Sequence, residues 1–167
     1  MHEDKRLWLQ QWALAAEIIG GLAVVVSLIF LILETRENTN AIQAQTYQDL
    51  SAELNNVRQQ MTSEDITILL FKLRDDGLSS LTEVERYRIV TSIHGIWQVY
   101  ESAYYAKQRN ILGDEEWTRF EIGICRNLNS DFEVWAPPQG GIVSNITPAF
   151  REHVEYLCAD IISANET

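Results

Sequence analysis

Residues 18–33 read IIGGLAVVVSLIFLIL, a run of sixteen residues without a charged side chain. Extending it back through Ala13–Ala16 gives about 21 residues, interrupted only by Glu17. A helix of that length is roughly 30 Å long, the thickness of the hydrocarbon core of a bilayer. A cleaved signal peptide has a shorter apolar run and small residues at its cleavage site, which Leu31–Glu37 lacks. Residues 13–33 are therefore predicted to form a retained transmembrane helix.

The residues that flank this helix predict its orientation. Trp8 and Trp12 precede it and are typical of the membrane interface. Lys5 and Arg6 also precede it, whereas Arg36 is the lone basic residue soon after it. Because basic residues favour the cytoplasmic side, we expect the N-terminus in the cytoplasm and the C-terminal domain outside it.

Small residues recur along one face of the predicted helix at alternating steps of three and four: Ala13, Ala16, Gly20, Ala23 and Ser27. Such a stripe lets two helices approach closely, so we expect this helix to associate with copies of itself or with another membrane protein. Glu17 is the one acid within the span. A carboxylate there costs a few kcal/mol unless it is protonated, paired or interfacial. It is interpreted as an interfacial or paired structural residue, or as a contact for an ion or a partner's cation.

The chain after the span is predicted to be all-α. No helix breaker occurs between residues 34 and 61, so the span should continue into a long helical arm. One apolar face of this arm is formed by Tyr47, Leu50, Leu54, Val57 and Met61. Arg36, Asn40 and Gln43 lie on the same face nearer the bilayer, where they form a solvated surface or, in a symmetric assembly, face a water-filled axis.

Residues 62–167 are predicted to form an acidic bundle of about four helices, after a short N-terminal segment (1–12), the span and the arm. Each helix begins at a capping motif, in chain order Thr62–Asp65, Thr82–Glu85, Gly113–Glu116 and Thr147–Pro148. Gly77 is expected to stop the first helix. A loop is expected at Pro137–Gly141, and the last helix should run through Ile161.

Three segments carry a resemblance: Arg36–Ala41 (RENTNA), Leu112–Trp117 (LGDEEW) and Phe150–Val154 (FREHV). They are similar to an R-x-N-T-x-A segment, an acidic helix start with Trp, and a late Phe-Arg-x-x-Val helix. These features occur in a group of small bacterial single-span membrane proteins with a C-terminal helical domain. The group has no known activity. The resemblance therefore implies this architecture and the bacterial inner membrane, and no catalytic residues.

Few residues suggest chemistry. Cys125 and Cys158 fall on different predicted helices and are either two buried free thiols or, in an extracytoplasmic domain, one disulfide. His153 shares a helix with Glu152, Glu155 and Cys158, but the two glutamates are three apart and predict an exposed acidic face. The sequence lacks G-x-S-x-G, P-loop and G-x-G-x-x-G motifs. We expect no enzyme, no metal site and no cofactor.

Charge narrows the classes of partner. The 167 residues include 13 Lys and Arg against 24 Asp and Glu, a net charge of −11, which argues against nucleic-acid binding. The partners expected are the lipid bilayer and this chain itself or another membrane protein. We predict a non-enzymatic, membrane-anchored interaction or assembly protein, either a homo-oligomer or an accessory subunit of a membrane complex. The alternative is a homo-oligomeric ring with a cation or proton pathway along Glu17, Arg36, Asn40 and Gln43.

Overall fold

The computed structural model describes residues 3–135 and 142–165, with side chains at 12, 16–130, 134–135, 142 and 144–163. Within these ranges the chain forms helices and turns and no strand, which confirms the prediction of an all-α fold. The chain divides into two compact units, Met1–Ile42 and Gln43–Thr167. The side chain of Trp8 and the loop predicted at Pro137–Gly141 lie outside the described residues.

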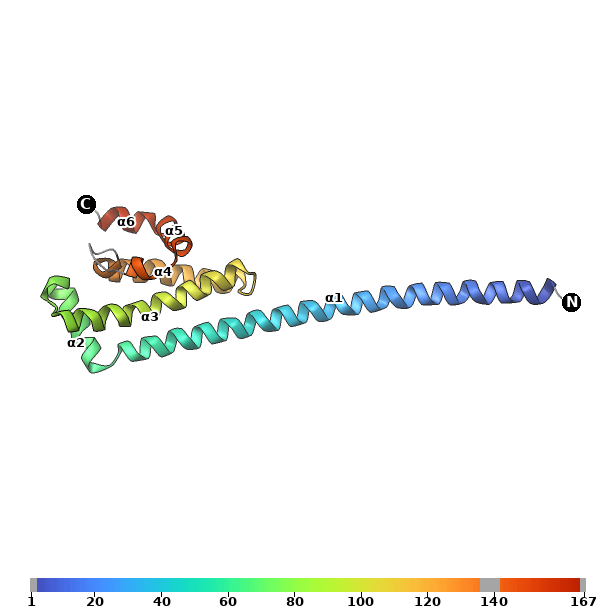
Figure 1. Ribbon diagram of the computed structural model, residues 1–167, viewed down its shortest axis with the longest axis horizontal. Helices are drawn as coiled ribbons and strands as arrows, with labels where there is room; N and C mark the ends of the chain where they lie inside the picture. The colour runs from blue at the N-terminus through green and yellow to red at the C-terminus, as the bar shows by residue number, and fades with distance from the viewer. Residues whose placement is uncertain (1–2, 136–141, 166–167) are drawn as a thin grey trace. The chain divides into compact units, whose positions relative to one another are not determined.

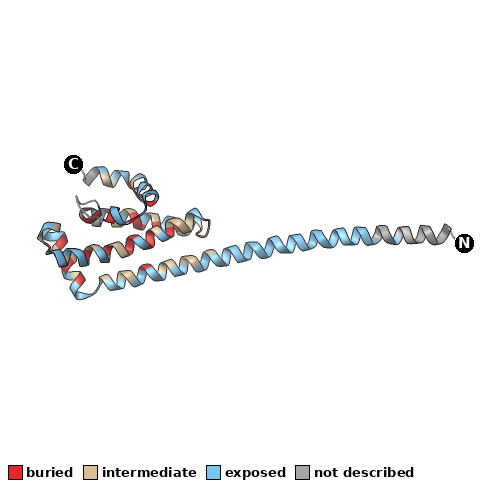
Figure 2. Cartoon of the chain, viewed as in Figure 1, coloured by how far each residue is buried: buried red, intermediate tan, exposed pale blue. Residues whose placement is uncertain are grey.

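The longest element is the helix α1, Glu3–Met61, which runs without a break through the predicted span and arm (Figure 1). The predicted continuity of these two segments is thus confirmed. All residues from Ala16 to Ile42 are exposed (Figure 2). The helix ends at a turn in which the N–H and Oγ1 of Thr62 both donate to the carbonyl of Gln59, at 3.2 and 2.7 Å.

The second unit contains the last part of α1 and a set of shorter helices. They are α2 (Glu64–Asp76), η1 (Leu78–Ser80), α3 (Glu83–Gln108), α4 (Asp114–Trp135), η2 (Ile142–Asn145), α5 (Pro148–Leu157) and α6 (Ala159–Asn165). α3 packs against α2, α4 and η2, and α4 in turn carries α5 and α6 (Figure 1). Gly77 caps α2 as predicted, with φ of 76° and its N–H donating to Leu73 at 2.9 Å.

The last predicted helix is divided in two, so five α-helices follow α1 in the described ranges instead of about four. α5 ends at Leu157, and Cys158 leaves helical geometry with φ of −113° and ψ of 28°. Cys158 is bonded to Cys125 of α4. This bond holds the break against α4, and α6 then directs Ile161 and Ile162 onto the core. The tertiary constraint therefore interrupts a helix that local sequence would have continued.

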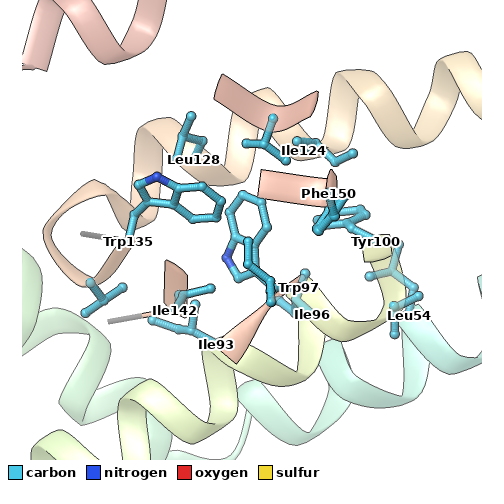
Figure 3. Packing of buried hydrophobic residues seen from close by; sticks show 14 of the residues in the cluster. Leu54, Ile93, Ile96, Trp97, Tyr100, Ile124, Leu128, Trp135, Ile142 and Phe150 are labelled. Carbon is cyan, nitrogen blue, oxygen red and sulfur yellow. The ribbon is translucent and has the colours of Figure 1, made fainter. Parts of the chain in front are cut away.

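The apolar faces of the helices meet in one core (Figure 3). Trp97 of α3 faces Trp135 of α4, with ring centroids 4.4 Å apart. Tyr100, one turn further along α3, lies beside Leu54 of α1 in the same view and packs edge-on against Phe120 of α4, at 6.4 Å. Leu54 is buried and its predicted companions on α1 are partly buried against the core, which confirms the predicted apolar face of residues 47–61.

The capping box predicted at the start of α3 is present. The N–H of Glu85 donates to Thr82 Oγ1 at 3.3 Å, and the N–H of Thr82 donates to Glu85 Oε2 at 2.8 Å. Lys72 Nζ of α2 donates to both oxygens of the same carboxylate, at 3.0 and 2.9 Å. The Thr82 N–H and the Lys72 ammonium lower the pKa of Glu85 to about 2. One carboxylate thus caps α3 and ties it to α2.

We expect Glu85→Gln to lower stability at neutral pH and to reduce its dependence on pH in the acid range. Because the pKa of Glu85 is depressed in the folded chain, its stabilising effect is complete above the ordinary value of 4.5 and is lost as the pH falls toward 2. Urea unfolding of the full chain in detergent, measured from pH 7 to pH 3, should show the difference between wild type and variant narrowing. Glu83→Gln, which changes an exposed residue in the first turn of the same helix, is the control. If the difference in stability between wild type and Glu85→Gln stays constant with pH, the proposed role of the Glu85 carboxylate is wrong.

Gly123 allows a close approach between α4 and Tyr100 of α3. A Cβ atom on residue 123 would lie 2.8 Å from Tyr100 Oη and 3.3 Å from Cε1. Tyr100 has little room to move because it is fully buried and its hydroxyl accepts a hydrogen bond from Asn127 Nδ2 at 3.0 Å. The contact between these two helices therefore requires glycine.

Gly123→Ala should destabilise the chain by about 1 kcal/mol or more, because overpacking costs typically 1–3 kcal/mol and outweighs the gain in helix propensity. Asn129→Ala, on the exposed face of α4, is the matched control and should change stability by less than about 0.5 kcal/mol. In a Tyr100→Phe background the penalty should shrink, since the nearest atom is the hydroxyl oxygen. Urea unfolding measures the stability of these variants and of the wild type, and a Gly123→Ala variant as stable as wild type would disprove the steric argument.

Candidate interaction site

Residues 16–33 of α1 present an apolar surface that the chain itself does not cover. An 18-residue window in Ala16–Met61 has a mean hydropathy of 2.6, and none of it is buried. The side chains of Ile19 and Phe30 are each 68% exposed. Among the described residues, α1 is the one helix long and apolar enough to cross a membrane. This segment is therefore not a core helix of its own chain.

The stripe of small residues lies on this exposed segment. A Cβ atom added to Gly20 meets no other atom within 4 Å, so the packing of the chain does not require glycine there. Ser27 Oγ donates to the carbonyl of Ala23 at 2.8 Å, which satisfies the hydroxyl within the helix. Ala16 is exposed as well. The side chain of Ala13, the first predicted member, lies outside the described residues.

The polar residues predicted as ion or partner contacts all lie on α1, in both units of the chain. Glu17, Arg36 and Asn40 are exposed on α1 in the first unit. Gln43 belongs to the second unit, where its Nε2 donates to the carbonyl of Asn110 at 3.1 Å. Asn110 has a φ of 58° in the turn after α3, a conformation that Asn tolerates better than most residues. Gln43 therefore has a local structural role in holding this turn.

Cys125 of α4 and Cys158, at the break between α5 and α6, form a disulfide with Cα atoms 5.4 Å apart. Of the two alternatives that the sequence leaves open, the structure thus contains the bonded pair. The bond joins residues separated by 33 positions and fastens the end of α5 to α4. Disulfides form and persist in oxidising compartments and are rare in the cytosol.

The side chains considered as metal ligands do not assemble into a site. Cys158 is in the disulfide, and the ring of His153 packs against Tyr104 and Trp117, with centroids 5.0 and 5.6 Å apart. Burial lowers the pKa of His153. In the part of the chain that the structure describes, no three His, Cys, Asp or Glu residues lie close enough together to hold a metal ion.

A groove in the second unit involves residues that no sequence motif singles out. It has a volume of about 330 Å³ and is lined by α1, α3 and α4. Three of its lining residues are arginines: Arg58, Arg119 and Arg126. Arg58 lies one residue after Val57, within the range of the predicted apolar face of α1, and Arg119 and Arg126 are seven apart on α4. Helical spacing could have placed the last two on one face, but only the fold places them near Arg58.

Comparison of the chain with protein-family models, curated proteins and solved structures gives no match. Three features of the chain bear on its function: the exposed apolar segment of α1, the disulfide-linked helices of the second unit, and the groove with three arginines.

Removing the disulfide should lower the free energy of unfolding by about 3 kcal/mol, because the bond restricts the unfolded chain over a loop of this length. The test is urea unfolding of the full chain in detergent with and without dithiothreitol. The double variant Cys125→Ala, Cys158→Ala should have the lower stability and no response to dithiothreitol. Thiol titration of the wild type, denatured without reductant, should find no free thiol; two free thiols would show that the bond is absent.

Proposed function

We propose that this chain is a non-enzymatic, membrane-anchored interaction protein that assembles through α1 with copies of itself or with another membrane protein. The observation that carries the proposal is the apolar surface of residues 16–33, exposed on every side of the helix. Contiguous exposed apolar surface of this extent is typical of contact with lipid or with another protein. The bilayer covers most of this surface, and a neighbouring helix covers its small-residue stripe.

The chemistry of the stripe suits a helix contact inside a bilayer. Ala16 and Gly20, and again Ala23 and Ser27, are four residues apart, the spacing that lets two helix backbones approach closely. Hydrocarbon provides no partner for a polar group, and Ser27 meets this requirement through its bond to the carbonyl of Ala23. Thr35 Oγ1 is satisfied in the same way, by the carbonyl of Leu31 at 2.7 Å. A single span encloses no pathway, so its activity in the membrane depends on association.

Two observations support an orientation with the second unit outside the cytoplasm. Lys5 and Arg6 precede the apolar segment, whereas Arg36 alone follows it closely. The disulfide between Cys125 and Cys158 favours an oxidising compartment. Together with the resemblance to bacterial single-span proteins, these features support the bacterial inner membrane with a cytoplasmic N-terminus.

The contact made by Gln43 favours an interaction protein over a ring with an ion pathway. In the ring, Gln43 would share a water-filled face with Arg36 and Asn40. Its amide instead donates to the carbonyl of Asn110 in its own unit and is only partly exposed. Glu17, Arg36 and Asn40 are then more simply explained as residues of an exposed helix at and beyond the edge of the bilayer.

The two neighbouring glycines of α1 provide a sharp test of the stripe. Gly20→Leu should weaken association by roughly tenfold or more, because a leucine holds the helices apart, and Gly20→Leu with Ala23→Leu should abolish it. Gly21→Leu is the matched control: an added Cβ meets no atom within 4 Å at either glycine, but residue 21 faces about 100° away on the helix. Native mass spectrometry of the full chain in mild detergent measures the assembly and any co-purified subunit.

Equal effects of Gly20→Leu and Gly21→Leu would show that the stripe is not the contact. A wild-type chain that is monomeric at all concentrations and brings no other membrane protein with it would overturn the proposed function as a whole. If the chain forms a homo-oligomer, its role is self-assembly. If another membrane protein co-purifies with it in a fixed ratio, the chain is an accessory subunit of that complex.

A further inference from the structure

The groove between α1, α3 and α4 has a cationic lining. Its lining includes Arg58 of α1 and Arg119 and Arg126 of α4, and no aspartate or glutamate with a described side chain lines it. This composition is unusual for a chain with 24 acidic against 13 basic residues. Like charges repel one another, so three guanidinium groups around one hollow indicate that it can accept an anion.

The arginines keep hydrogen-bonding capacity for a ligand. Arg119 Nη1 donates to Tyr47 Oη at 3.1 Å, and its Nη2 lies 3.6 Å from Glu115 Oε1. Arg58 and Arg126 form no hydrogen bond or ion pair through their guanidinium groups with any described residue. Each guanidinium carries five N–H donors in a planar fork that suits phosphate or carboxylate oxygens. The Tyr47 hydroxyl thus orients one arginine, and the other two have their donors available.

The floor of the groove is apolar and firmly packed. Leu54, Tyr100 and Phe120 line it and are all buried in the core (Figure 3 shows Leu54 beside Tyr100). Gly123 completes the floor at the close contact with Tyr100. Ile122, which is 64% exposed, also lines the groove. Apolar walls with a few convergent polar groups are typical of sites for small molecules, and the volume is at the lower end of their range.

We propose that this groove binds a small organic phosphate, with the phosphate held by Arg58, Arg119 and Arg126 and the apolar body resting on Leu54, Phe120 and Ile122. A phosphate monoester carries a charge near −2 and three acceptor oxygens, which matches three guanidinium groups better than a carboxylate does. The ligand is either a soluble phosphate monoester or the headgroup of phosphatidic acid, since the two present the same phosphate monoester to the arginines. This binding is additional to the association through α1 and does not depend on it.

The first test uses four compounds on the full chain in an uncharged sugar detergent at low salt. Isothermal titration should give a dissociation constant of about 1 mM or tighter for phenyl phosphate. Inorganic phosphate lacks the apolar body, and benzoate lacks the second charge, so both should bind about tenfold more weakly. Phenol, which lacks the anion, should show no binding. Failure of phenyl phosphate to bind at 10 mM, or equal binding of phenol, would overturn the proposal.

Variants then locate the site. Arg58→Gln and Arg126→Gln should each weaken phenyl phosphate binding by about tenfold, because each removes a charged donor. Arg109→Gln removes the same charge from an exposed position outside the groove and should leave binding unchanged. An equal loss of affinity in all three variants would show that binding depends only on the net charge of the chain. It would contradict a specific site in the groove.

A measurement on the wild type keeps the test independent of variant folding. In NMR spectra, phenyl phosphate should shift the Nε–H resonances of Arg58 and Arg126 and leave that of Arg109 in place; the opposite pattern would disprove the site. Competition with dihexanoyl phosphatidic acid then identifies the source of the phosphate. Displacement of phenyl phosphate supports a lipid headgroup, and retention supports a soluble ester.

Discussion

The structure depends on an apolar surface that the chain cannot bury by itself. Residues 16–33 of α1 are exposed on all sides, and at about 25 cal/mol per Å² such a surface is strongly unfavourable in water. The remainder of the chain has its own closed core, with no need of this segment. A solvent other than water, or a partner, therefore has to stabilise α1. This requirement underlies the proposed membrane anchoring and the proposed association through the small residues on one face.

The second unit is stabilised by a different combination of forces. Its core depends on α3, whose Trp97 and Tyr100 contact α4, while the Glu85 carboxylate ties α3 to α2. The helices after α4 are short, and helices of that length contribute little to the stability of a bundle. The disulfide between Cys125 and Cys158 compensates by fastening the end of α5 to α4. A domain with few long helices and one covalent link suits an environment where thiols stay oxidised.

Local signals predicted most of the fold, and tertiary contacts account for the rest. Gly77 and the Thr82–Glu85 capping box act within one turn of helix, so they could be identified from spacing alone. The break at Cys158 could not, because it arises where the chain is bonded to a residue 33 positions earlier. The same distinction holds for Gln43: its helical register was evident, but its partner Asn110 lies 67 residues away. The stripe on α1 stays a prediction, since a partner helix would have to be observed against it.

The groove shows why a candidate site can escape a search by motif. Tyr47, Leu54 and Arg58 follow one another along α1 with helical spacing, and the apolar members of this series were read as a core face. Arg58 follows Leu54 by about one helical turn, is partly buried and lines the groove. A long arginine side chain can pack its aliphatic part against apolar residues while its guanidinium stays in water. The arginines of α4 approach from a helix that Gly123 brings close to Tyr100. A cationic hollow thus results from the same close helix packing that builds the core, and its chemistry becomes visible only after the core is assembled.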